Sequence, residues 1–188
     1  MACYAKPGQT WTFYEIDPTV LAIAQNERFF SYLNCAGGTV NHMLGAARLQ
    51  LKNAPDGHYS LIVLDAFSSD AIPTHLLTKE AIDLYLSKLA PGGRLLFHIS
   101  NKYLNLRPVI AELAHTANLI SLEVGYDLRS QLANGGEGLD PSVWAIAARR
   151  EQDFGSLLTN PHWQKSQRQS NSVWTDDYSN VLSALEWK

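Results

Sequence analysis

Acidic and polar side chains follow several apolar runs that we expect to be strands. Glu15 and Asp17 close the run WTFYEID, and Asp65 closes YSLIVLD, the most apolar run of the chain. Ser100 and Asn101 follow the run LLFHI. The carboxyl ends of parallel strands meet at one edge of a sheet, where helix N-termini supply N–H donors. We therefore expect a ligand site at this edge.

The two acids of the first run have different predicted roles. A carboxylate offers two acceptor oxygens in one plane, which suits the two hydroxyls of a ribose. Glu15 is therefore predicted to bind a ribose, and the alternative is a solvated strand end. Asp17 is followed by Pro18, an order typical of a helix N-cap and first helical position.

Asp65 is the strongest candidate for a functional carboxylate. It ends a strand of continuous Leu, Ile and Val character, so it must lie beside low-dielectric surroundings, where an unpaired charge is costly and a functional one is common. His75 follows in the next predicted helix and either borders the site or is a surface histidine. His98 lies inside a predicted strand and is interpreted as a satisfied core residue.

Apolar runs of strand length alternate with amphipathic segments of helix length, which is typical of a parallel sheet with helices on its faces. Strands are predicted at 10–16, 39–44, 59–65, 93–99, 119–126 and 142–149. Helices are predicted at 20–33, 46–51, 74–89, 106–118 and 154–158. The last two strands are expected to pair antiparallel. The predicted class is α/β, a doubly wound, mostly parallel sheet.

The composition excludes several classes of protein. The 188 residues are 46% apolar and 18% charged, which favours one globular domain over a disordered chain or a coiled coil. A net charge of -3 without basic clusters makes nucleic acid and membrane surfaces poor partners. The two cysteines, Cys3 and Cys35, have neither metal-site spacing nor a disulfide framework, so we expect a reducing, cytoplasmic environment.

The remaining polar motifs are weaker. No two of the six histidines stand three or four residues apart, so no helical metal pair and no metal is predicted. Ser68 and Ser69 lack the G-x-S-x-G context of a hydrolase nucleophile. Asp176, Asp177 and Tyr178 form either a lid over a cationic substrate or a solvated tail.

Several phrases together resemble the spermidine synthases, which have the fold of adenosylmethionine-dependent methyltransferases. These phrases are YEID at 14–17, GAARL at 45–49, YSLIVLDAFSSDAIP at 59–73 and the Pro-Gly-Gly before LLFHIS. The phrases IPTHLLTKEA and WTDDYSN are similar to the synthase-like domain that is fused behind a transporter-like membrane domain in bacteria.

The resemblance implies transfer of an aminopropyl group from decarboxylated S-adenosylmethionine to a polyamine, with no metal. It makes Asp65 the base that receives the amine proton and also a contact of the nucleoside. Other implied contacts of the nucleoside co-substrate are Glu15, Ile16, Gly45 and Ala46. The implied contacts of the polyamine are Asp70, His75, Tyr103, Asp177 and Tyr178.

The sequence departs from the family pattern in several places. The first strand and its glycine-rich loop are missing, Ala46 stands where relatives have an adenine-binding Asp, and the loop DAFSSD is longer by two residues. Lys102 would repel a polyamine. We therefore expect weakened nucleoside binding. The missing strand would lie between 10–16 and 59–65, so two open sheet edges should cause homo-oligomers or other edge association.

Three functions remain open at this stage. The first is the aminopropyltransferase, the second is a small-molecule methyltransferase that uses S-adenosylmethionine, and the third is a non-catalytic binding or interaction domain. The predicted organisation is a methyltransferase-like domain at 1–150, with an extension at 151–188 that packs on the same domain.

Overall fold

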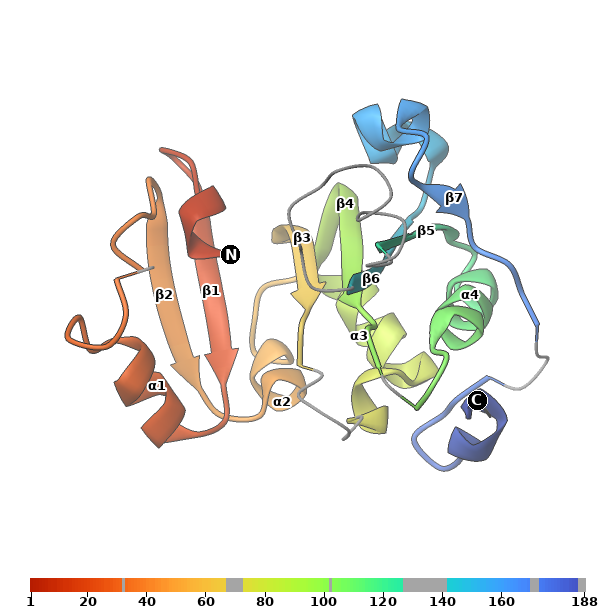
Figure 1. Cartoon of the computed structure of the whole chain (residues 1–188), viewed down its shortest axis with the longest axis horizontal. Helices are drawn as coiled ribbons and strands as arrows, with labels where there is room; N and C mark the ends of the chain where they lie inside the picture. Colours follow the sequence, from red (N-terminus) through yellow and green to blue (C-terminus); the bar gives the residue numbers. More distant parts are fainter. Residues whose placement is uncertain (32, 67–72, 102, 127–141, 170–172, 186–188) are drawn as a thin grey trace. The chain divides into compact units, whose positions relative to one another are not determined.

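The computed structural model describes residues 1–31, 33–66, 73–101, 103–126, 142–169 and 173–185. The chain divides into two compact units, unit 1 from Met1 to Ala54 and unit 2 from Pro55 to Lys188 (Figure 1). These compact units divide after Ala54, and the domain boundary predicted at residue 150 stays a prediction. The extension after residue 150 belongs to unit 2.

Unit 1 is built on two parallel strands. Its elements are η1 (Ala2–Tyr4), β1 (Thr10–Glu15), α1 (Pro18–Ala24), β2 (Thr39–Leu44) and α2 (Ala47–Leu51). The register of β1 and β2 places Glu15 beside Leu44, so both strands end at the same edge. The residues that follow these two strands therefore lie close together, as a parallel pair requires.

Helix α1 begins as the sequence predicts but ends early. The Asp17 carboxylate accepts a hydrogen bond from the Thr19 N–H at 2.7 Å, and Pro18 occupies the first turn. The helix ends at Ala24, whereas 20–33 was expected to be helical. After it, the Asn26 side chain accepts from the Arg28 N–H at 3.0 Å. This local bond offers the backbone an alternative to the helix, which explains the early end.

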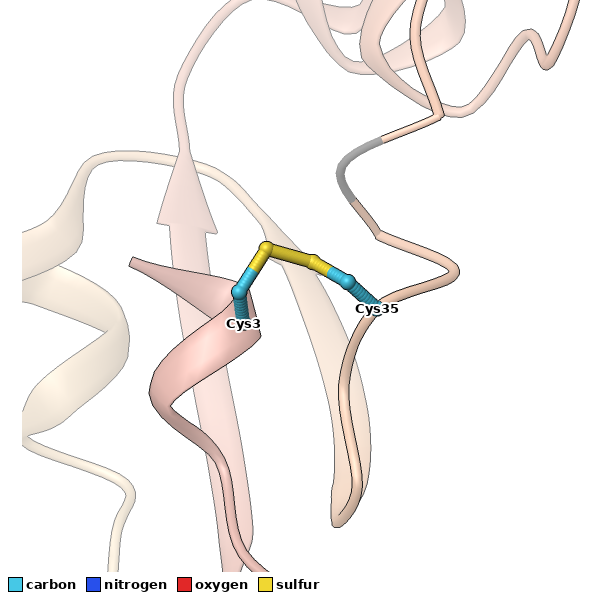
Figure 2. The surroundings of a disulfide bond; sticks show 2 residues. All are labelled: Cys3 and Cys35. Carbon is cyan, nitrogen blue, oxygen red and sulfur yellow. A yellow bond between two sulfur atoms is a disulfide. The ribbon is translucent and has the colours of Figure 1, made fainter.

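A disulfide bond joins Cys3 to Cys35, so the expectation of unpaired cysteines is wrong. Figure 2 shows Cys3 on the short helix η1 and Cys35 in the segment that leads into β2. Their Cα atoms lie 4.8 Å apart, within the ordinary range for a disulfide. The two residues are 32 positions apart, and the side-by-side pairing of β1 and β2 brings their flanking segments together.

Unit 2 contains a five-stranded mixed sheet. Its strands are β3 (Tyr59–Leu64), β4 (Leu89–His98), β5 (Ile120–Tyr126), β6 (Ser142–Ala148) and β7 (Gln164–Lys165). The order is β3-β4-β6-β5-β7, in which β3 and β4 are parallel and the other neighbours antiparallel. The expected antiparallel pairing of the last two long strands is confirmed, and so is the α/β class.

Both faces of this sheet are covered. Leu95 and Phe97 lie on the face lined by Ile110 and Leu113 of α4 (Arg107–Thr116) and Ile82 of α3 (Lys79–Lys88). Alternate strand residues point to the other face, where Leu122, Ile146 and Ala148 pack with Phe154 of η3 (Glu151–Thr159). His98 and Trp144 share this second parity, so they lie on the η3 side of the sheet.

The C-terminal segment is held on unit 2 by polar and apolar contacts. Arg168 donates two hydrogen bonds to the buried Glu112 of α4, at 2.8 and 2.9 Å, and these bonds raise the pKa of the guanidinium. Trp174 is 1% exposed. Beyond it, η4 (Val181–Ala184) leads to a bridge between Leu104 and Leu185.

Among the described residues, four strands pair on one side only, namely β1, β2, β3 and β7. β1 pairs with β2 alone, and β3 pairs with β4 alone. β1 and β3 are the strands between which the resemblance places the missing strand. In the described part of the chain, no helix is both long enough and apolar enough to cross a bilayer.

The disulfide predicts a defined thiol count and a measurable contribution to stability. Unfolded, unreduced protein should show no reactive thiol with Ellman's reagent, and both cysteines should react after reduction. Cys35→Ser should lower the free energy of unfolding by about 3 to 4 kcal/mol, because the cross-link restricts the unfolded chain over a long loop. Urea unfolding measures the loss, and reduced wild-type protein is the matched control. Two reactive thiols before reduction would contradict the pairing.

Candidate active site

Asp65 follows the last residue of β3, the buried Leu64. Its side chain is 47% exposed, so the carboxylate lies at the rim of the sheet and not inside it. The parallel register places Leu64 beside Phe97 of β4, and the next residues of the two strands are Asp65 and His98. Asp65 Oδ1 lies 2.7 Å from His98 Nδ1, within hydrogen-bonding distance.

His98 connects Asp65 to two further elements. Its Nε2 lies 2.8 Å from Ser100 Oγ, and Ser100 Oγ accepts a hydrogen bond from the Val143 N–H at 2.8 Å. The imidazole also stacks on the Trp144 indole, with ring centroids 4.5 Å apart. Asp65 therefore belongs to a hydrogen-bonded array that spans β3, β4 and the start of β6.

The sequence interpretation of His98 as a core histidine missed this array. The ring is satisfied by hydrogen bonds, but its side chain is 24% exposed and faces the predicted catalytic carboxylate. One signal could have found it: His98 ends a strand and Asp65 directly follows its parallel neighbour, and equivalent ends of neighbouring parallel strands share one edge.

The predicted nucleoside-binding residues of unit 1 gather at the ends of β1 and β2. The Glu15 carbonyl accepts from the Gly45 N–H at 2.8 Å, so these two residues are neighbours. Glu15 Oε1 accepts from the Asp17 N–H at 2.9 Å. Ile16 is 69% exposed, and Ala46 is the residue before α2. The geometry thus groups all four predicted contacts of this unit on one short stretch of sheet edge.

Gly45 has a conformational reason to be glycine. Its φ is 132°, and a Cβ at this position would meet the Gln50 side chain. Glycine therefore lets the chain turn from β2 into α2 beside the Gln50 side chain.

The predicted polyamine contacts lie on several segments of unit 2. Tyr103 is 47% exposed, and His75 is exposed in η2 (Thr74–Leu76). Asp177 and Tyr178 are exposed in the C-terminal segment. Asp70 and Lys102 lie outside the described residues, so the geometry of the longer loop and its second acid stays a prediction.

The acidic C-terminal turn is attached to the start of α3. Thr78, the N-cap of α3, donates its hydroxyl to Asp176 Oδ1 at 2.7 Å, and the Asp176 N–H donates to Glu80 at 3.0 Å. The Trp174 carbonyl accepts from the Lys79 N–H at 2.8 Å. Asp176 therefore has a structural role, while the neighbouring Asp177 presents its side chain to solvent.

Within the described ranges, no three His, Cys, Asp or Glu side chains group around a common point.

Similarity to solved structures identifies the fold. A probable spermidine synthase from Corynebacterium glutamicum ATCC 13032 superposes with a TM-score of 0.57 at 12% identity, covering 90% of this chain and 64% of that one. The chain has a spermidine synthase-like fold. The spermidine synthase from Thermotoga maritima agrees, with a TM-score of 0.50 at 11% identity over 94% of this chain and 57% of that one.

Sequence similarity to the spermidine synthase-like group is restricted to part of the chain. A polyamine aminopropyltransferase from Vibrio vulnificus (strain CMCP6) is 41% identical over 76 residues, which are 39% of this chain and 24% of the relative. No family model matches. The match therefore spans about a quarter of the length of the curated relative.

The adjacent acids Asp176 and Asp177 provide a matched pair of variants. Asp176→Ala should lower the free energy of unfolding by about 1 to 2 kcal/mol, because it leaves the part-buried Thr78 hydroxyl without its acceptor. Asp177→Ala should change it by less than about 0.5 kcal/mol, because the side chain is exposed. Urea unfolding measures both. Equal losses in the two variants would contradict the separate roles.

Proposed function

We propose that this domain moves an aminopropyl group from decarboxylated S-adenosylmethionine to a polyamine acceptor. The observation that carries the proposal is the half-exposed Asp65 carboxylate at the carboxyl end of β3, held by His98. The partial similarity to a protein named polyamine aminopropyltransferase supports it.

The reaction needs a neutral amine and good positioning. The amine nitrogen attacks the carbon next to the sulfonium, a C–N bond forms, and the C–S bond breaks with its electron pair passing to sulfur. The acceptor amine is protonated at neutral pH, so a carboxylate beside it must first bind the ammonium and then accept its proton. Asp65 has this role in our proposal, and methylthioadenosine leaves.

The other site residues have binding roles in this proposal. Glu15 binds the ribose through the carboxylate oxygen that does not accept from the Asp17 N–H. Ile16, Gly45 and Ala46 contact the nucleoside, with Gly45 offering backbone. The polyamine contacts Asp70, His75, Tyr103, Asp177 and Tyr178.

A cytoplasmic location is also part of the proposal. Disulfides are typical of oxidising compartments, so the bond between Cys3 and Cys35 is the feature that speaks against it. The thiol count of protein purified from its native host without reductant would decide between a reducing cytoplasm and an oxidising compartment.

The function predicts a strong and selective effect of one substitution. Asp65→Asn should lower kcat by about 100-fold or more, because the amide cannot accept the proton. Turnover is measured as methylthioadenosine release from millimolar decarboxylated S-adenosylmethionine and a diamine. Asp83→Asn, in an exposed ion pair on α3, is the matched control and should retain activity.

Calorimetry with methylthioadenosine tests nucleoside binding separately from turnover. Retained activity in Asp65→Asn would contradict its role as the base. Methyl transfer from S-adenosylmethionine to the diamine would favour the methyltransferase. Absence of both nucleoside binding and turnover would favour the non-catalytic domain.

Association through strand edges is a further part of the proposal. Among the described residues, one side of β1 and one side of β3 have no strand partner, and a strand edge of this kind favours pairing with another strand. Leu61 of β3 is exposed and adds apolar surface to that edge.

Edge pairing predicts self-association at micromolar concentration, measured by light scattering. Leu61→Lys should reduce it, because a charge on an edge strand opposes pairing. Leu158→Lys replaces another exposed leucine, on η3, and should leave association unchanged. A wild-type chain that stays monomeric would contradict the edge proposal.

A further inference from the structure

The contacts around Asp65 form a directed array of hydrogen bonds. A carboxylate can only accept, so the 2.7 Å contact between Asp65 Oδ1 and His98 Nδ1 requires the hydrogen to lie on Nδ1. A neutral imidazole that donates from Nδ1 has its lone pair on Nε2. That nitrogen faces Ser100 Oγ at 2.8 Å.

The Ser100 hydroxyl is the donor for His98 Nε2. Its Oγ already accepts from the Val143 N–H at 2.8 Å, so its own hydrogen is available to His98 Nε2. The donors then run from the backbone of β6 through Ser100 and His98 to Asp65. Hydrogen bonds that run in one direction polarise each other and strengthen the last bond.

The array rests on rigid elements. Val143 and Trp144 belong to β6, and His98 is paired with Trp144 in the antiparallel register of β4 and β6. Stacking on the Trp144 indole fixes the plane of the His98 imidazole. The two hydrogen bonds of its ring nitrogens fix the rotation of the ring within that plane. Precise active-site geometry is best held by such strand-borne supports.

We propose that His98 and Ser100 are positioning residues for Asp65. His98 occupies Asp65 Oδ1, so Oδ2 is the oxygen that meets the acceptor ammonium and receives its proton. This role rests on the proposed aminopropyl transfer. The competing interpretation is a structural link between β3, β4 and β6 that has no effect on the reaction.

Two substitutions of His98 separate these interpretations. The amide nitrogen of Asn occupies nearly the position of His Nδ1, and that of Gln occupies nearly the position of Nε2. His98→Asn therefore keeps a donor toward Asp65, whereas His98→Gln keeps a group toward Ser100 only. Both lose the ring that stacks on Trp144, and they differ from each other in size by one methylene.

We expect His98→Gln to lower kcat by about 10-fold or more, and His98→Asn to restore most of that loss. Circular dichroism and urea unfolding check that both variants fold equally well. Equal activity in the two variants, whether high or low, would overturn the positioning role, because a structural link does not distinguish the two ends of the ring.

A second measurement does not depend on turnover. Long-range nitrogen–proton NMR spectra of the full chain should show His98 as the Nδ1–H tautomer, and Asp65→Ala should remove this preference. The signal is assigned by its loss in His98→Gln. An Nε2–H tautomer in the unmodified chain would overturn the proposed array. The Nδ1–H tautomer in a chain without turnover would instead leave the array standing and reject the aminopropyl transfer.

Discussion

The parallel pairing of β3 with β4 is the constraint on which the site depends. Its register makes Leu64 and Phe97 neighbours, so the residues that follow them, Asp65 and His98, must emerge side by side at the sheet edge. β6 pairs with the other side of β4 and brings the Val143 N–H and the Trp144 ring to the same place. A single strand, β4, thus connects the carboxylate to its supports.

Unit 1 is small and needs contacts other than a large core to stabilise it. Parallel strands are usually buried in larger sheets, yet this unit has only two among its described residues. Several of its large apolar side chains are exposed, among them Ile16, Phe29 and Leu44. The disulfide and the Asp17 cap both stabilise this small unit, and they lie at opposite ends of β1.

The features predicted best from the sequence are those made by residues close together in the chain. The Asp17 cap before Pro18 was visible because its partner, the Thr19 N–H, is two residues away. The antiparallel pairing of β5 with β6 followed from two adjacent apolar runs. The disulfide and the bond between Asp65 and His98 were not predicted, because each joins residues more than 30 positions apart through strand pairings that the sequence does not state. The Asp65 carboxylate itself was predicted, since its position at a strand end follows from the apolar run before it.

The position of β6 in the sheet also has a consequence for how the chain acquires its structure. β6 lies between β4 and β5, although it follows both in the sequence. During synthesis β4 can pair with β3 as soon as both have emerged, but neither β4 nor β5 can pair with β6 until Ser142–Ala148 has left the ribosome. Pairings between distant segments form slowly, and unpaired strands are exposed in the meantime. The half-formed sheet is therefore the species that a chaperone would meet, and the arrival of β6 is the step that ends its exposure.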